Sequence, residues 1–124
     1  MTKNFKIEEF ECKGGCEMPF DVYENIIKLA NQLQFLRTYT GRPIKINSGY
    51  RCPEHNAKVG GSKTSQHLLG KAADITIQSL KPAEVYKIIE DLIDLGHMLQ
   101  GGLGLYDTFV HYDIRKVKAR WDGR

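Results

Sequence analysis

The sequence predicts an α+β fold in which helices pack on one face of a small, mainly antiparallel sheet. Apolar residues make up 41% and charged residues 27% of the 124 residues, the balance of a globular chain that can bury one core. Segments with helical and strand periodicity follow one another in the order helix, strand, loop, strand, helix, strand, strand. No repeat or linker interrupts this order, so we expect a single domain over residues 1–124 whose free sheet face carries a site.

The first helix is predicted from its cap and its apolar spacing. Asp21 has the position of an N-cap, with Glu24 three residues later, and the helix ends near Gly41. The apolar residues between these ends recur at helical spacing: Val22, Ile26, Leu29, Ala30, Leu33 and Leu36. The other predicted elements are strands over residues 44–47, 72–77, 102–106 and 109–115 and a helix between Pro82 and Gly96.

The segment from Ser48 to Gly70 is the unusual part of the chain. It is rich in Gly, Ser, Pro, Asn and Lys, which predicts a loop. Loops of this length are uncommon inside a small domain unless they have a function. We therefore expect this segment to carry functional residues.

The charge of the chain indicates no particular partner. A net charge of +3 is too small to imply a polyanion. A basic tail surrounds Trp121, and we expect a solvated terminus there, with contact to an anionic wall polymer or to nucleic acid as the weaker alternatives. No segment is long and apolar enough to cross a membrane, and the N-terminus is not a secretory signal, so we expect synthesis in the cytoplasm.

Three cysteines, Cys12, Cys16 and Cys52, cannot all pair within one chain. Without a secretory signal we expect reduced thiols. Cys12 and Cys16 flank Gly14 and Gly15, which is typical of a turn with buried thiols or of one half of a zinc site. The turn is favoured, because the sequence shows no second pair of ligands at matching spacing.

Two histidines and one aspartate have the clearest chemistry. His67 ends the polar loop, and Asp74 lies within the apolar run 72–77, where a buried carboxylate is costly unless a cation or a metal pairs with it. Alternation places His111 and Asp113 on one face of the last predicted strand. Two imidazoles and one carboxylate form a three-ligand zinc set that leaves the fourth position for water, as in catalytic sites. A hydrogen-bonded core histidine and an aspartate paired with a basic residue are the alternatives on spacing alone.

Residues 65–74, Ser-Gln-His-Leu-Leu-Gly-Lys-Ala-Ala-Asp, match the pattern Ser-x-His-x-x-Gly-x-Ala-x-Asp. This segment resembles the signature of zinc D-Ala-D-Ala carboxypeptidases and murein endopeptidases, the hedgehog-type zinc peptidases. Residues 48–51, together with Asn56, and residues 109–113 resemble two further elements of that family in the same order. The likeness is to the small, phage-associated, single-domain branch, and it implies a hedgehog/DD-peptidase-like version of the α+β fold.

The resemblance implies that His67, Asp74 and His111 bind one zinc ion. It also implies that Arg51 binds substrate, because a guanidinium beside the metal can hold a terminal carboxylate or a polarised carbonyl oxygen. Ser65 is expected to order the loop or to position a ligand.

The resemblance leaves the general base open, because Thr108 and Phe109 occupy positions where relatives often carry a proton acceptor. Asp113 is the first choice, since it shares a strand face with His111 and lies about 7 Å along it. Asp107, in the preceding turn, is the second. Asp113 could instead orient a ligand imidazole or the substrate arginine.

Other polar and aromatic residues have weaker predicted roles. Tyr50, Tyr106 and Tyr112 flank the motifs, where one could line a substrate groove, although strand tyrosines usually pack. We assign Tyr50 to substrate binding. His55 and His97 are expected to be solvated loop or helix residues.

We expect a zinc-dependent peptidase that hydrolyses peptide bonds in the stem peptides or cross-links of bacterial peptidoglycan, as a carboxypeptidase or an endopeptidase. The alternative is a non-catalytic peptidoglycan-binding or phage structural module on the same fold. In either case we expect a monomer whose partner is a peptidoglycan peptide, without nucleic-acid binding or membrane insertion. Such a protein would act on the cell wall after release or as part of a phage particle.

Overall fold

A computed structural model describes all residues from Met1 to Arg124. Five strands form one sheet in the spatial order β1-β2-β4-β3-β5. Its strands are β1 (Ile44–Ser48), β2 (Ala72–Ile77), β3 (Gly102–Leu105), β4 (Val110–Asp113) and β5 (Ala119–Asp122). The helices are α1 (Phe20–Thr40), α2 (Pro53–Lys58) and α3 (Pro82–Asp94), with short 3-10 helices η1 (Ile7–Phe10) and η2 (Gln66–Leu69). All strand pairs are antiparallel except β3 with β5, so the predicted α+β class is confirmed.

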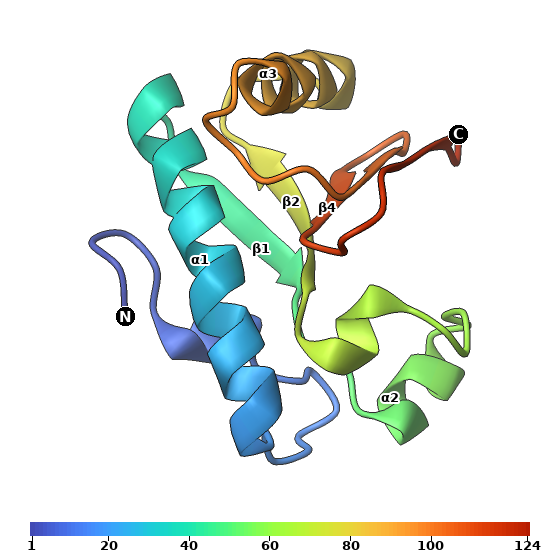
Figure 1. Ribbon diagram of the computed structural model, residues 1–124. Helices are drawn as coiled ribbons and strands as arrows, with labels where there is room; N and C mark the ends of the chain where they lie inside the picture. The colour runs from blue at the N-terminus through green and yellow to red at the C-terminus, as the bar shows by residue number, and fades with distance from the viewer.

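The core lies between the sheet and the two long helices. In Figure 1, α1 crosses beside β1 and α3 covers the upper end of the sheet, whereas α2 lies at the opposite end. The apolar residues predicted for the first helix are all buried, as are Val85, Ile89, Leu92 and Ile93 of α3. The strands contribute alternate residues such as Ile75, Leu103 and Tyr112 to this core. The strand positions between them point to the opposite face of the sheet, and these include Asp74, His111 and Asp113. The sheet thus carries apolar contacts on one face and polar chemistry on the other. None of the helices has the length and apolar character that crossing a bilayer requires.

The ends of α1 agree with the prediction to within two residues. The N-cap is Pro19 and makes no side-chain cap, so the predicted cap at Asp21 is wrong. Asp21 lies in the first turn instead, where its negative charge favours the positive end of the helix dipole. At the other end Gly41 adopts a left-handed conformation with φ of 67°, and its N–H donates to the Arg37 carbonyl at 3.0 Å.

The segment from Ser48 to Gly70 is more structured than its composition predicts. It contains α2 and η2, both too short to show a periodic pattern in the sequence. The tail that was expected to be solvated forms β5, which pairs in parallel with β3. The Arg120 side chain within it bonds Glu90 of α3 with both nitrogen–oxygen distances at 2.8 Å.

A β-bulge interrupts the pairing of β1 with β2 at the end nearest the polar site. Ile46 lies opposite Ile75, but the next paired residue of β1 is Ser48, which lies opposite Asp74. One residue of β1, Asn47, is therefore extra. The bulge brings Ser48 to the same position along the sheet as Asp74 and directs the chain that follows toward the polar face.

The cysteines differ from the prediction of three reduced thiols. Cys16 and Cys52 form a disulfide with a Cα–Cα distance of 6.3 Å, and Cys12 is free and buried. The N-terminal arm folds back on the segment after β1, where the Tyr50 N–H donates to the Phe10 carbonyl at 2.9 Å. This contact brings together thiols that are 36 residues apart, which spacing along the sequence does not reveal.

Candidate metal centre

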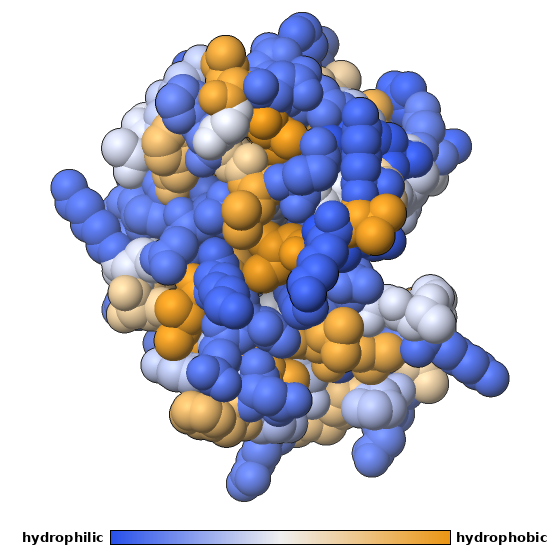
Figure 2. Space-filling model, in the orientation of Figure 1, coloured by the Kyte–Doolittle hydropathy of each residue, from blue (hydrophilic) through white to orange (hydrophobic).

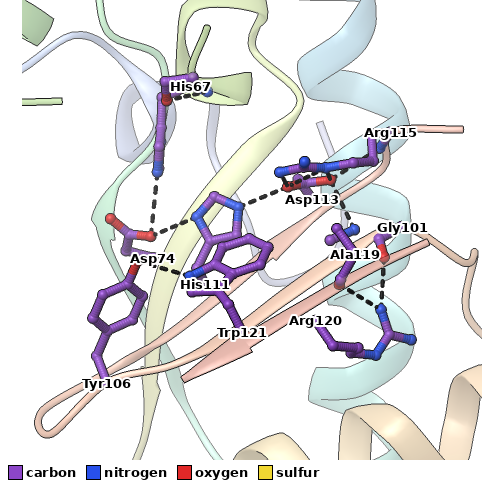
Figure 3. Close-up of polar contacts among 12 residues, drawn as sticks. His67, Asp74, Gly101, Tyr106, His111, Asp113, Arg115, Ala119, Arg120 and Trp121 are labelled. Atoms are coloured by element: carbon purple, nitrogen blue, oxygen red, sulfur yellow. Dashed lines mark hydrogen bonds and ion pairs between the residues drawn. The ribbon is translucent and has the colours of Figure 1, made fainter. Parts of the chain in front are cut away.

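The structure brings His67, Asp74 and His111 together at one point. Asp74 on β2 lies directly opposite His111 on β4, and His67 comes from η2 just before β2. The Asp74 Oδ1 atom is 3.2 Å from His67 Nε2 and 3.2 Å from His111 Nδ1. All three side chains are buried, and their ligand atoms lie within 4.8 Å of one another. Figure 3 shows both imidazoles directed at the same carboxylate.

The second nitrogen of each imidazole has its own partner. His67 Nδ1 is 2.7 Å from the Gly49 carbonyl oxygen, and His111 Nε2 is 2.7 Å from Asp113 Oδ2. Because these oxygens only accept hydrogen bonds, each of these nitrogens carries the proton and donates it. The other nitrogens, which face Asp74, then present lone pairs, as metal-binding histidines do. Three electron-rich atoms directed at one point favour a cation between them.

The electrostatics of the cluster agree with this geometry. Burial alone would raise the pKa of Asp74, but its contacts with His111 and His67 outweigh burial and hold the pKa well below its usual value. Burial would also lower the pKa of His111, but its contacts with the Asp113 and Asp74 carboxylates outweigh burial and raise that pKa. Both shifts show that the surroundings stabilise positive charge among these residues.

Asp113 is fully buried and held on all sides. Besides His111, it bonds the Arg115 guanidinium through both oxygens, and its Oδ1 accepts the Gly102 N–H at 2.9 Å. A Cβ atom at Gly102 would overlap the carboxylate, so only glycine fits there. The side chain therefore lies behind His111, away from Asp74. Its position matches the alternative reading, a carboxylate that orients an imidazole, and not that of a base directed at substrate.

Arg51 joins the cluster from the connection between β1 and α2. Its Nη2 lies 3.2 Å from Asp74 Oδ2, its Nε donates to Ser48 Oγ at 3.0 Å, and Nη1 donates to Asn56 Oδ1 at 3.3 Å. Ser65 is the N-cap of η2, and its hydroxyl accepts the His67 N–H at 3.1 Å. Ser65 thus caps the short helix that carries His67.

A cleft of about 570 Å³ opens onto these residues. Its lining includes Arg51 and the clustered His67, Asp74 and His111, together with Tyr106, Phe109, Arg115 and Trp121. In Figure 2 the outline of the molecule is indented on the right, between the C-terminal strands and the part that carries α2. Two cations and several aromatic rings therefore surround the opening.

Trp121 reaches the cleft because Gly104 lies between it and His111 in the sheet. Gly104 is paired with both residues, and a Cβ atom there would overlap the indole. The indole centroid is 5.0 Å from that of His111, and Trp121 Nε1 donates to the Tyr106 hydroxyl at 2.9 Å. The Arg115 guanidinium lies over the indole at 5.4 Å.

Comparison with known protein families agrees with this donor set. A family model described as Peptidase M15 matches residues 3–113, which include all three clustered residues and Arg51. The chain belongs to this family. M15 enzymes are zinc metallopeptidases. The two histidines and the aspartate of this chain are ligands that zinc commonly has, so the site agrees with the family. A search of curated proteins finds no match.

Three predicted residues of the peptidase lie away from the cleft. Tyr50 is 5% exposed and packs in the core, so it does not form a substrate groove. Tyr112 is buried as well and donates to the Leu99 carbonyl at 2.8 Å. Asp107 is exposed in the turn before β4 and is not among the residues that line the cleft.

Two residues that line the cleft, Arg115 and Trp121, were not predicted from the sequence to belong to the site. Arg115 and Trp121 lie after the last recognised motif, and β5 lies beyond the residues that the family model matches. A signal was present in the lone tryptophan of a basic tail, since a buried or half-buried tryptophan usually has a packing or binding role. The pairing of β5 with β3 could not be inferred, because parallel pairing leaves no local pattern.

Proposed function

We propose that the protein is a zinc-dependent peptidase that hydrolyses peptide bonds in the stem peptides or cross-links of bacterial peptidoglycan. The observation that carries this proposal is the convergence of two imidazole lone pairs and one carboxylate on the floor of a cleft. Both imidazoles are fixed from behind, so the donors are arranged before any ligand arrives.

His67, Asp74 and His111 are the residues that would hold the zinc ion. Two nitrogens and one oxygen are donors that zinc favours, and three protein ligands are typical of its catalytic sites. When bound, zinc lowers the pKa of water toward neutrality and polarises a carbonyl oxygen. Asp113 positions His111 by accepting a hydrogen bond from the His111 Nε2–H, and the Arg115 guanidinium donates to Asp113 in turn.

Arg51 is the residue that we assign to substrate binding. Its guanidinium is fixed by Ser48, Asn56 and Asp74, so little side-chain entropy is lost when a substrate oxygen binds. It lies at the cleft beside the proposed zinc ligands, where it can bind a terminal carboxylate or a carbonyl oxygen. Arg115 adds a second positive charge to the lining of the cleft. A short anionic peptide, such as a stem peptide, fits these charges.

Digestion of purified peptidoglycan tests the proposal. The zinc-loaded protein is expected to release free alanine if it acts as a carboxypeptidase, or to create new amino termini in the wall if it acts as an endopeptidase. The His67→Ala variant is expected to do neither. Equal hydrolysis by that variant would refute the assignment.

A non-catalytic wall-binding module is the second candidate, and one observation favours it. Asp74 is the only carboxylate that lines the cleft, since Asp113 is buried behind His111 and Asp107 lies outside. Binding to sedimented peptidoglycan without any released terminus, across pH and with zinc or cobalt present, would support the module and exclude the peptidase.

A further inference from the structure

A second group of metal-ligating side chains lies where the N-terminal arm meets the connection between β1 and α2. Cys12 and Cys52 are buried and Cys16 is half-buried. Their sulfur atoms lie within 4.8 Å of one another. The Cys16–Cys52 disulfide accounts for two of them and leaves the Cys12 thiol beside it.

The distance between Cys12 and Cys52 is the one that a zinc site requires. Their sulfur atoms are 3.8 Å apart. In a tetrahedral site with zinc–sulfur bonds of about 2.3 Å, two sulfur ligands are separated by about 3.8 Å. Reduction of the disulfide frees Cys16 to move to a similar distance, so the backbone already places three thiols at the corners of one site.

His55 is the candidate for the fourth corner, although its nitrogens are not among the ligand atoms that lie within 4.8 Å of one another. It lies in the first turn of α2, three residues after Cys52, which is the N-cap of that helix. Its ring packs on the turn between Cys12 and Cys16, because a Cβ atom built on Gly14 would lie 2.9 Å from His55 Nδ1. The histidine hydrogen bonds of the structure involve His67 and His111, so the His55 nitrogens are available. Cys52 and His55 are thus the second ligand pair that the sequence analysis did not find.

We propose that the reduced chain binds one structural zinc ion through Cys12, Cys16, Cys52 and His55. A dithiol reductant gives two electrons and two protons to the Cys16–Cys52 disulfide and is itself oxidised to a disulfide. The three thiols release their protons as they bind the ion. Four protein ligands leave no open coordination position, which is the arrangement of a structural site.

This site would stabilise the segment that positions two residues of the cleft. The segment that precedes Cys52 contains Gly49, whose carbonyl holds His67, and Arg51, whose guanidinium holds Asp74. A Cβ atom at Gly49 would overlap the backbone of Phe10, so the N-terminal arm and this segment are in direct contact. Either the disulfide or the proposed zinc site fastens the same two segments together.

Cobalt spectroscopy on the full chain tests the proposal independently of peptide hydrolysis. The His67→Ala/His111→Ala variant lacks the cleft site, so any tight metal binding must occur elsewhere. After reduction with a phosphine, this variant is expected to bind one equivalent of Co²⁺ with a thiolate-to-cobalt charge-transfer band. The oxidised variant is expected to show no such band. Adding His55→Ala should weaken binding at least tenfold, whereas His97→Ala, a change at an exposed histidine, should not alter it.

Absence of the charge-transfer band in the reduced double variant would overturn the proposal, as would equal binding after His55→Ala. A second measurement covers variants that fail to fold. In reduced wild-type protein, zinc is expected to protect all three cysteines from alkylation, and a chelator is expected to restore it. Equal alkylation rates with and without zinc would also overturn the proposal.

Discussion

The chain contains two clusters of metal-ligating side chains that are built in different ways. The His67–Asp74–His111 cluster depends mainly on paired strands, and hydrogen bonds hold each imidazole in place. The cluster of Cys12, Cys16 and Cys52 depends on loops and on one covalent bond. The first is arranged by the fold itself, whereas the second helps to arrange the fold.

This difference predicts different responses to the same kind of change. Removing a ligand from the strand cluster should affect chemistry and leave the sheet intact, because the core lies on the opposite face. Removing Cys16 or Cys52 from the cysteine cluster should affect stability, because it breaks the covalent bond between the N-terminal arm and the segment that follows β1.

His67→Ala is the largest expected effect. It removes a zinc ligand, so the loss of peptidoglycan hydrolysis should exceed the roughly 10²–10³-fold cost of removing one oxyanion donor. Zinc content in the oxidised protein should fall with it, while the circular dichroism spectrum and the unfolding midpoint stay close to wild type. A large drop in the midpoint would show that the strand cluster also stabilises the fold, which would contradict the proposed difference between the two clusters.

Reduction of the disulfide in the presence of a chelator is expected to have the next largest effect. The bond joins residues with a sequence separation of 36, and a closed loop of that size stabilises the folded chain by about 3–4 kcal/mol. Urea unfolding of oxidised and reduced protein measures the difference. The Cys12→Ser/Cys16→Ser variant is the control, since it keeps a single cysteine and its stability should not respond to reductant. Equal midpoints for oxidised and reduced wild type would contradict this prediction.

Asp113→Asn sharpens the role of the residue behind His111. Loss of an orienting carboxylate typically costs about 10–100-fold in metal affinity or activity, and we expect that range in a zinc competition assay. Asp122→Asn is a matched control, because Asp122 bonds Arg124 as Asp113 bonds Arg115 but is exposed at the C-terminus. Equal losses in both variants would show that the arginine pair, and not contact with His111, is responsible.

Glu90→Gln is the smallest expected effect. The bonds from Arg120 outweigh burial and hold the pKa of Glu90 below its ordinary 4.5, so the carboxylate stabilises the folded chain above that pH. This contribution is lost as pH falls through the lowered pKa. Both partners are partly exposed, so we expect about 1 kcal/mol at neutral pH and less in acid, measured by urea unfolding.

The matched control for Glu90→Gln lies on the same helix. Asp91 pairs with Lys87 one turn earlier, but both side chains are more than half exposed. Asp91→Asn is therefore expected to cost less than about 0.5 kcal/mol. A cost at Asp91 equal to that at Glu90 would mean that the link between β5 and α3 adds no special stability.

Much of the fold and the centre of the site could be predicted from the sequence, because both leave local patterns. Helical spacing in α1 and alternation in β1 reflect burial on one face, and the aspartate within an apolar strand signals a buried charge. The position of Asp113 could not be predicted, because strand alternation gives the face of a side chain and not the direction of its carboxylate. The Cys16–Cys52 bond and the path of β5 depend on contacts between distant segments, which periodicity does not record.

The bulge at Asn47 has a consequence for any attempt to move this site to another scaffold. Side chains along a regular strand alternate between faces, so straightening the strand there would pair Asn47 with Asp74 and turn Ser48 and the residues after it to the opposite face. Two anchors of the cleft, the carbonyl behind His67 and the guanidinium beside Asp74, would then be lost together although neither residue had been altered. A graft that copies the metal ligands but straightens this strand would keep these two groups in its sequence and direct them away from the site.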